Sequence, residues 1–441
     1  DYEFSGVISG GGSLTKDGSG ILTLSSQNTY SGGTTVNNGT LDLVGQQIID
    51  GTLTVDGSSS VVKLSGTSNN ATIGITSITV QNGGTFTDNT AGSLVQSLNS
   101  PVTFNNGGTI TSEAGSDGSS GWGNFLFNGA INVTGTGLAT ISSNGMSIGF
   151  SKTVTVADTV AGAGTDLLIT SSIRPNYLGT ITKEGAGTVE LTANDSNDTS
   201  PWVINNGTLK FNSAEAFGSS GTLSASSGIT VNSGGTLDVA NQWNTAENGA
   251  LTINGGVLNF SSGTDTNFVN NLTLNDGATV SASTGSDGFR AGYFRDATIT
   301  VGGSSASTIS SKLLLADNGG VRKVTFNVAD VTSSADADLT MSGVISDLSG
   351  FAGAGLIKTG AGTLTLSNRN NSYTGGTTVD NGILSLNGTN RAVSLIGTGT
   401  LTINDGAQVD AYVNAFGWTY QNAIVINGGI LNSAAGDSHI N

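Results

Sequence analysis

The chain has 441 residues, of which 14 are Lys or Arg and 31 are Asp or Glu, so its formal net charge at pH 7 is −17. This acidic balance argues against a basic groove for nucleic acid and against attachment to anionic lipid. Cysteine is absent, which excludes disulfides, thiolate metal sites and cysteine nucleophiles. Glycine is abundant, at 68 residues, but proline is rare, at 3, so a collagen-like or proline-rich chain is excluded as well.

Apolar and small polar residues alternate along the chain, and this alternation predicts short β-strands. Residues 18–41 read as strand, turn, strand, turn and strand, and nearly the same text returns at 360–384. A degenerate copy lies at 185–209. Each copy is preceded by a lysine two residues before its first glycine: Lys16, Lys183 and Lys358. Such repetition indicates a repeat architecture.

Asn-Gly and Asp-Gly turns separate the short strands, since glycine and asparagine accept positive φ at little steric cost. Successive turn glycines are 18 to 27 residues apart, at Gly39, Gly57, Gly83 and Gly107 in one stretch and at Gly207, Gly234, Gly255 and Gly277 in another. These intervals fit one turn of a parallel β-helix better than antiparallel hairpins. We therefore predict an all-β fold, a right-handed parallel β-helix (solenoid) of about 20 coils.

A longer period lies above the coil, because the three lysines are 167 and 175 residues apart. We predict one continuous β-helix over 1–441, built of tandem units at approximately 1–173 and 174–346 and a partial unit at 347–441. The chain starts without Met and inside a repeat, so we expect a mature piece or a fragment. No apolar run approaches the roughly 20 residues of a membrane-spanning helix, so we expect no span in this chain.

The two close copies share the pattern Gly-Xaa-Gly-Xaa-Leu-Thr-Leu, followed by Asn-Xaa-Tyr-Xaa-Gly-Gly-Thr-Thr-Val-Xaa-Asn-Gly-Xaa-Leu or, at 360–384, its near-identical form. This pattern resembles the passenger-associated transport repeat of bacterial autotransporters. The middle copy departs from it, because Asn194–Trp202 replaces the Tyr-Ser-Gly-Gly segment. The residues that carry the resemblance, which we expect at turns of the coil, are Gly18, Gly20, Tyr30, Gly32, Gly33, Asn38, Gly39, Gly185, Gly187, Asn206, Gly207, Gly360, Gly362, Tyr373, Gly375, Gly376, Asn381 and Gly382.

The resemblance implies secretion across the outer membrane, a right-handed parallel β-helix, and often adhesion or self-association. We accordingly expect a non-enzymatic structural protein, an autotransporter-like passenger rod at the bacterial cell surface or in the extracellular space, acting in adhesion, biofilm or fibre formation. The expected partners are further copies of the chain, joined through β-helix ends or lateral faces into a homo-oligomer or filament, and host or matrix glycans. The alternative is a polysaccharide-binding or polysaccharide-degrading β-helix protein.

Catalytic residues are not expected. His439 is the one histidine and lies near the C-terminus, so a Ser-His-Asp triad is hard to assemble. A sugar-cleaving β-helix would instead place carboxylates or arginines on neighbouring coils. The aromatic and arginine residues that could mark such a site form either a stack inside the coil or an interaction patch: Trp122, Phe125, Phe127, Phe289, Arg290, Tyr293, Phe294 and Arg295.

An acidic run that could chelate Ca²⁺ contains Asp330, Asp336 and Asp338. We expect a solvated loop there instead, and predict no cofactor and no metal ligand. The turn asparagines could be mistaken for polar ligands. We expect their amides to hydrogen-bond along the stack of coils or to the turn backbone.

Overall fold

A computed structural model of the chain describes residues 1–66, 69, 72–90, 94–113, 124–162, 164–174, 179–193, 200–212, 228–240, 250–261, 269–283, 286, 288–291, 296–315, 322–387, 395–412 and 422–434. These residues fall into an N-terminal unit, Asp1–Ser220, and a C-terminal unit, Gly221–Asn441. Their regular structure is β-strand throughout. Within the described ranges, no helix has the length and apolar character that crossing a membrane requires.

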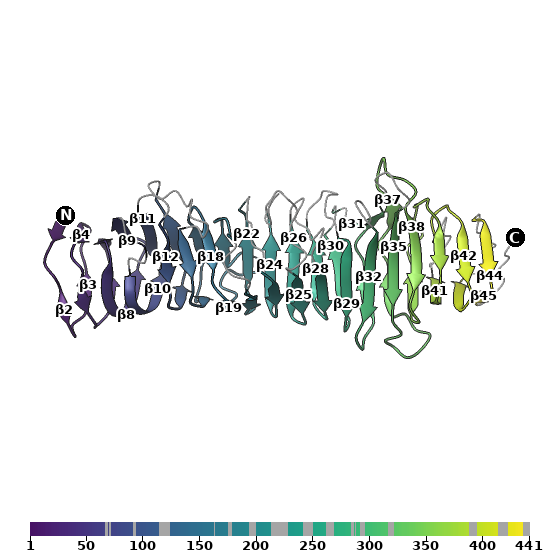
Figure 1. The fold of residues 1–441 in the computed structure, drawn as a ribbon, viewed down its shortest axis with the longest axis horizontal. Coiled ribbons are helices and arrows are strands. Elements are labelled where there is room, and N and C mark those ends of the chain that lie inside the picture. Colours follow the sequence, from purple (N-terminus) through teal and green to yellow (C-terminus); the bar gives the residue numbers. More distant parts are fainter. Residues whose placement is uncertain are drawn as a thin grey trace. The chain divides into compact units, whose positions relative to one another are not determined.

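In the N-terminal unit, successive coils place their strands side by side in two long parallel sheets (Figure 1). The first sheet contains β1 (Tyr2–Phe4), β4 (Ile21–Leu24), β7 (Gly39–Val44), β9 (Ser60–Gly66), β11 (Thr85–Thr90), β14 (Gly108–Ser112), β17 (Ala139–Ser142), β20 (Leu167–Ile169), β22 (Thr188–Leu191) and β24 (Gly207–Phe211). The second contains β3 (Leu14–Lys16), β6 (Thr34–Val36), β8 (Gln47–Asp56), β10 (Thr72–Gln81), β13 (Val102–Asn105), β16 (Ile131–Thr134), β19 (Lys152–Val156), β21 (Ile181–Glu184) and β23 (Trp202–Ile204).

Some coils of this unit add a short strand on a third side. These strands also pair in parallel from coil to coil. They are β2 (Ser9–Gly10) with β5 (Thr29–Tyr30), and β12 (Gln96–Leu98) with β15 (Phe125–Phe127) and β18 (Met146–Ile148). A coil is therefore a two- or three-sided turn of chain.

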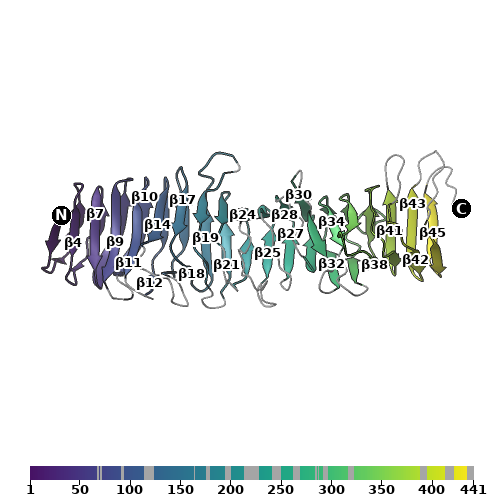
Figure 2. The same cartoon turned by 90° about the horizontal axis from the view of Figure 1, so that it is seen from above.

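The C-terminal unit repeats this arrangement (Figure 2). Its first sheet contains β26 (Gly235–Val239), β28 (Val257–Phe260), β30 (Thr279–Ala282), β33 (Ser307–Ile309), β36 (Leu339–Met341), β39 (Thr363–Leu366), β41 (Gly382–Asn387), β43 (Ala407–Tyr412) and β45 (Ile430–Ala434). Its second contains β25 (Ile229–Asn232), β27 (Leu251–Asn254), β29 (Asn271–Asn275), β32 (Ala297–Gly302), β35 (Lys323–Val328), β38 (Gly355–Thr359), β40 (Thr377–Val379), β42 (Leu401–Asn404) and β44 (Ile424–Asn427). The short third side is β31 (Phe289–Ala291), β34 (Leu313–Leu315) and β37 (Ile345–Asp347).

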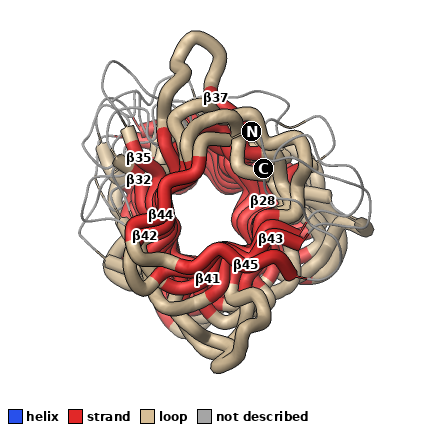
Figure 3. The backbone as a smooth tube through the Cα atoms, turned by 90° about the vertical axis from the view of Figure 1, so that its right-hand side faces the viewer, coloured by secondary structure: helices blue, strands red, loops and turns tan. Residues whose placement is uncertain are grey.

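Alternation along each strand builds the core. In β7, Leu41 and Leu43 are buried while Thr40 and Asp42 are partly exposed, because successive side chains of a strand point to opposite faces. Registered pairing stacks the inward residues of successive coils into columns, and the strands of the C-terminal unit surround the interior when viewed end-on (Figure 3). Each fully buried aliphatic side chain contributes about 1.5–3 kcal/mol.

The predicted fold class is confirmed: the chain is all-β and its parallel strands stack as a β-solenoid. Over the described ranges, the coil count is slightly below the expected value of about 20. Among the described residues, the first sheet has ten strands in the N-terminal unit and nine in the C-terminal unit, one per coil. The right-handed sense and the division into tandem units of about 170 residues remain predictions.

Candidate functional site: three lysine clips

A lysine occupies an inward-facing strand position in each repeat copy. Lys183 pairs in register with Val154 of the preceding coil and Ile204 of the following coil. Lys16 and Lys358 hold the same position in their own copies. The exposed fractions of the three lysines are 7%, 0% and 0% in chain order. Lysine is almost never fully buried unless it is paired, so the partners of these ammonium groups define the site.

Main-chain carbonyl groups surround each ammonium. Lys183 Nζ donates to the carbonyl oxygens of Glu184 (2.9 Å) and Gly185 (2.7 Å) in its own coil, and of Asn206 (3.0 Å) in the next coil. The other two copies repeat this set, with Lys16 donating to Asp17 (3.3 Å), Gly18 (2.6 Å) and Asn38 (3.0 Å), and Lys358 to Thr359 (2.8 Å), Gly360 (2.8 Å) and Asn381 (3.1 Å). An ammonium has three N–H donors, and each finds one carbonyl acceptor.

Glycine is required where these carbonyl groups converge. Gly185 has φ +78°, in the left-handed region that turns its carbonyl toward the ammonium. Gly207, directly above it in the next coil, has φ +67°. A Cβ added to Gly207 would lie 2.5 Å from the carbonyl oxygens of both Gly185 and Gly187. The matching glycines have the same positive φ in the other copies: Gly18 and Gly39, and Gly360 and Gly382.

A buried aspartate of the preceding coil completes the site. Asp166 is 1% exposed, and its Oδ1 accepts hydrogen bonds from the amides of Thr159 (2.6 Å) and Val160 (2.7 Å). Its Oδ2 accepts from the amide of Thr188 (2.6 Å), the residue after Gly187. In the third copy, Asp338 accepts from Val331 (2.8 Å), Thr332 (2.8 Å) and Thr363 (2.7 Å). In the first copy, the corresponding bond joins Asp1 Oδ1 to the amide of Ile21 (2.8 Å).

Each site thus joins three successive coils through an aspartate, a lysine and the carbonyl of a turn asparagine. We call these sites lysine clips: the first is Asp1, Lys16 and Asn38, the second Asp166, Lys183 and Asn206, and the third Asp338, Lys358 and Asn381. Because the bonds go to main-chain groups, a clip fixes the position of one coil against the next rather than presenting a side chain to a ligand.

Burial dominates the electrostatics of the clips. Desolvation lowers the pKa of Lys183 to about 8, against the opposing effect of the Asp166 and Glu184 charges. Desolvation likewise lowers the pKa of Lys358 to about 8, opposed by the Asp338 charge. Both lysines are therefore mainly ammonium at neutral pH, the form that can satisfy three carbonyl acceptors at once.

A buried tyrosine accompanies the first and third clips. Tyr30 shares a hydrogen bond of 2.6 Å with the Thr34 hydroxyl, and Tyr373 shares one of 2.5 Å with Thr377. Burial raises the pKa of both phenols. In the middle copy Trp202 takes the strand position of Thr34, pairing with Ile181 as Thr34 pairs with Leu14, and it is 0% exposed. One indole thus fills the interior at this position.

A buried asparagine forms a second link across three coils in the first and third copies. Asn28 Oδ1 accepts from the amide of Ile8 (2.8 Å), and its Nδ2 donates to Gln47 Oε1 (2.7 Å). Asn371 Oδ1 accepts from the amide of Ile345 (2.8 Å), and its Nδ2 donates to the carbonyl of Leu395 (2.8 Å). These bonds satisfy polar groups that would otherwise be costly to bury.

The remaining glycines of the repeat signature also lie where coils meet closely. An added Cβ at Gly32 would stand 2.5 Å from the Gly12 carbonyl carbon, and Gly375 meets the main chain of Gly353 and Ala354 in the same way. Gly33 and Gly376 have φ +86° and +83°. Gly20, Gly187 and Gly362 each face the clip aspartate of the preceding coil: Asp1, Asp166 and Asp338.

Of the two alternatives for the aromatic residues, the interior position holds for the rings that the structure describes. Phe125 and Phe127 of β15 and Phe289 of β31 are each 0% exposed, so these rings lie in the interior and not on the surface. Phe289 stacks on Phe260, with ring centroids 5.5 Å apart. Arg290 is half-buried beside Phe289 in β31. The other members lie outside the described residues: Trp122, Tyr293, Phe294 and Arg295.

The acidic run does not act as a unit. Asp338 belongs to the third clip, whereas Asp330 and Asp336 are exposed, and Asp336 accepts a hydrogen bond from Ser334 (2.9 Å). In the part of the chain that the structure describes, no group of three or more His, Asp or Glu is placed to hold a metal ion. His439 lies outside the described residues.

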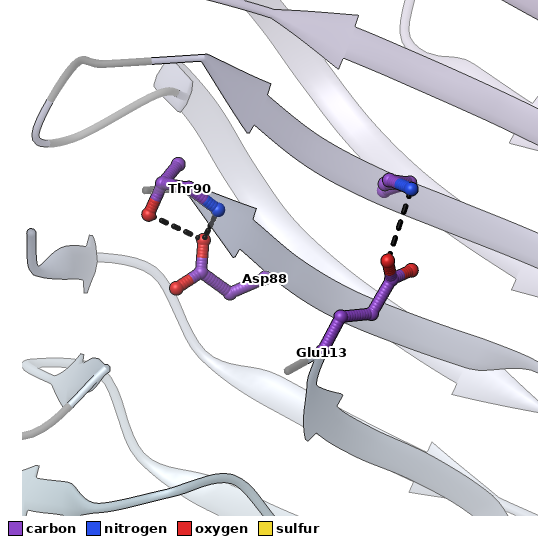
Figure 4. A network of polar contacts seen from close by, with 4 residues as sticks. Asp88, Thr90 and Glu113 are labelled. Atoms are coloured by element: carbon purple, nitrogen blue, oxygen red, sulfur yellow. Dashed lines mark hydrogen bonds and ion pairs between the residues drawn. The ribbon is translucent and has the colours of Figure 1, made fainter. Parts of the chain in front are cut away.

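Another buried carboxylate lies in the N-terminal unit. Asp88 Oδ1 accepts from the Thr90 amide (3.1 Å) and hydroxyl (2.9 Å) inside β11 (Figure 4). Glu113 lies on the outer side, where it pairs with Lys63 at 3.0 Å. The Lys63 and Glu113 side chains are 24% and 42% exposed, so solvent weakens this ion pair. These contacts stabilise the coil locally.

The sequence shows the clip lysines without a role for them, it does not point to Asp1 or Asp166, and it places Asp338 in an acidic run with a different expected role. A signal was present: an aspartate directly before an alternating strand, 15, 17 and 20 residues upstream of Lys16, Lys183 and Lys358. Two of the turn asparagines behave as expected: Asn206 Nδ2 donates to Glu184 Oε2 in the preceding coil (2.9 Å), and Asn381 Oδ1 accepts from its own turn.

Comparison with known proteins identifies these same segments. A family model described as the passenger-associated-transport-repeat matches the chain three times, at residues 14–43, 181–211 and 356–386. No curated protein and no solved structure matches the chain. Each matched segment contains the lysine and the turn asparagine of one clip.

Proposed function

We propose that this chain, which carries three passenger-associated-transport-repeats, is part of an autotransporter passenger domain exported to the bacterial cell surface or the extracellular space. The carrying observation is that all three matched segments build the same lysine clip within a parallel β-solenoid. Both the repeat and the fold fit a passenger domain.

We further propose a non-enzymatic, structural role in adhesion, biofilm or fibre formation. The charged side chains of the second and third clips are at most 1% exposed and bind main-chain groups, an arrangement that suits cohesion between coils. Outward threonines on the second sheet of the C-terminal unit also align in register: Thr230, Thr252 and Thr273, all partly exposed. Such a neutral hydrogen-bonding face suits lateral association with another copy or with glycans.

Export tests the first part of the proposal. The chain would be placed between a signal peptide and an autotransporter barrel, and its appearance outside the cell followed by protease accessibility and antibody labelling. We expect the native chain to reach the surface. Retention in the periplasm, with a barrel that exports another passenger normally, would contradict the proposal.

Clip variants then test whether the repeat matters for export. Lys183→Met and Lys358→Met should lower surface display, whereas Lys323→Met, an exposed lysine of β35, serves as the matched control. Equal display of all variants would show that the clips do not contribute to export.

Self-association needs a separate measurement on the purified chain. Sedimentation velocity over a wide concentration range should show concentration-dependent oligomers or filaments, and a monomer at every concentration would contradict this part of the proposal. Release of reducing ends from a polysaccharide panel by the same material would contradict the non-enzymatic role and favour the polysaccharide-degrading alternative.

A further inference from the structure

The turn of the third clip places an asparagine side chain against the amide that follows it. Asn381 is exposed, and its Oδ1 accepts a hydrogen bond of 2.6 Å from the amide of Gly382. This contact holds the Gly382 nitrogen beside the side-chain carbonyl carbon of Asn381. Gly382 has no Cβ to obstruct an approach along this direction.

The clip lysine acts on the same peptide group. Lys358 Nζ donates to the Asn381 carbonyl oxygen at 3.1 Å, and this oxygen belongs to the amide whose nitrogen is Gly382 N. When that N–H loses its proton, negative charge develops on this oxygen. A fixed ammonium donor at the place where charge develops stabilises it, and Lys358 itself is 0% exposed.

The first two clips share the lysine but arrange the asparagine differently. In the first, the Gly39 amide donates to the Ser59 carbonyl (2.9 Å) in the next coil. In the second, Glu184 accepts from the Asn206 side chain (2.9 Å) and so restrains it. The residue that corresponds to Glu184 in the third clip is Thr359, whose hydroxyl donates to Asn327 (3.4 Å) instead.

We propose that Asn381-Gly382 is a self-modification site, at which the folded chain converts Asn381 to aspartate and isoaspartate. The Gly382 nitrogen forms a bond to Asn381 Cγ, the Cγ–Nδ2 bond breaks, and Nδ2 leaves as ammonia carrying the proton lost from Gly382. The resulting succinimide takes up one water molecule, which opens either of its two carbonyl–nitrogen bonds and leaves a carboxylate. Asparagine is a labile residue, and positioning accelerates its reaction.

The product alters the clip in which it forms. Isoaspartate adds one methylene to the main chain at the carbonyl that Lys358 binds, so this hydrogen bond and the stacking of Gly382 on Gly360 must change. Each conversion also adds one negative charge to a chain whose formal charge is −17. The third clip therefore changes with the age of the molecule.

Peptide mapping of the incubated full-length chain tests the proposal. The protein would be held folded in mildly alkaline H₂¹⁸O, digested, and fragmented by electron transfer to distinguish aspartate from isoaspartate at Asn38, Asn206 and Asn381. We expect Asn381 to convert about tenfold faster than either of the others, since a positioned nucleophile is the difference between them. In denaturant the three Asn-Gly pairs should convert at similar rates. Conversion of folded Asn381 no faster than Asn38 would overturn the proposal.

An exchange of restraining residues provides matched variants. Thr359→Gln should give the Asn381 side-chain amide a hydrogen-bond acceptor, as the Glu184 carboxylate does for Asn206, and should slow conversion of Asn381 severalfold. Glu184→Thr should speed conversion at Asn206. Lys358→Met should slow Asn381, provided that circular dichroism shows a native fold. If Lys358→Met does not fold, Thr359→Gln and Glu184→Thr still test the proposal. Unchanged conversion rates in both of these variants would overturn it.

Discussion

The second and third repeat copies share the lysine clip but differ in the buried residues beside it. Both have the aspartate, the inward lysine and the stacked glycines, with ammonium-to-carbonyl distances of 2.7–3.0 Å in the second clip and 2.8–3.1 Å in the third. The third also has the Tyr373–Thr377 pair and the Asn371 link. In the second, Trp202 fills the interior at the threonine position.

The difference separates two kinds of requirement. The interior beside β23 needs volume without a particular hydrogen bond, so an indole can stand where a threonine stands elsewhere. The clip needs three N–H donors matched to three carbonyl acceptors, and glycines without Cβ, and all three copies keep this set. The lysine clip is therefore the part of the repeat that all three copies share, and the tyrosine–threonine pair is the part that varies.

The strongest test of this constancy is steric. Gly207→Ala should destabilise the N-terminal unit by about 4 kcal/mol, because the new Cβ meets two carbonyl oxygens and the residue must keep a positive φ. Gly382→Ala should cost the C-terminal unit the same amount. Urea unfolding would measure both. A large loss in one unit and a small loss in the other would show that the two clips are not equivalent.

Removal of the carboxylate should have the next largest effect. Asp338→Ala leaves the amides of Val331, Thr332 and Thr363 without their acceptor, at a cost of about 3 kcal/mol. Asp166→Ala is the matched variant in the second clip. Hydrogen exchange at these amides, read by mass spectrometry, should rise locally; protection equal to that of the native chain would contradict the assigned bonds.

Alkaline pH should strengthen both units. The pKa of Lys183 and Lys358 is about 8 in the folded chain and 10.5 when free, so between these values the unfolded chain holds more protons. The free energy of unfolding therefore rises with pH, by at most about 1.4 kcal/mol per pH unit for each lysine. Urea midpoints measured at successive pH values would show this slope. Lys183→Met and Lys358→Met should remove it, and a falling slope in the native chain would contradict the lowered pKa.

The smallest loss of stability is expected from changes to the tyrosine–threonine pair. Tyr373→Phe removes one buried hydrogen bond and should cost about 1 kcal/mol. Tyr30→Phe should match it, while Trp202→Phe in the middle copy should cost more, because it leaves a cavity. Equal losses at all three positions would mean that the cavity left by Trp202→Phe costs no more than one buried hydrogen bond.

The fold could be predicted from the sequence because glycines recur at the spacing of one coil. Gly39 and Gly207 must be glycine for steric reasons that recur in every copy, so their spacing reports the coil directly. The alternation of apolar and polar residues then predicts which side chains point inward, because successive side chains of a strand point to opposite faces. The sequence left open whether the aromatic residues stack inside the coil or form a patch, because Phe125 lies in a three-residue strand beside a Gly- and Ser-rich stretch, where alternation is too short to define a face.

The site was less accessible, because its parts meet only across coils. Lys183 was visible as a recurring residue, but its acceptors include the carbonyl of Asn206, 23 residues away. Nothing in the local sequence distinguishes Asp166, and Asp338 lies close in sequence to two exposed aspartates. Side-chain direction and the register between coils decide these contacts, and neither is written in a local motif.

The span of a clip has a consequence for engineering. One complete clip needs an aspartate, a lysine and an asparagine from three consecutive coils, as in residues 166–211. Moved as a block, such a segment would keep all the hydrogen bonds of its clip. A junction between Asp166 and Lys183 would instead place the aspartate and the lysine of the clip in different segments. Libraries of shuffled solenoids should therefore place their junctions outside these blocks.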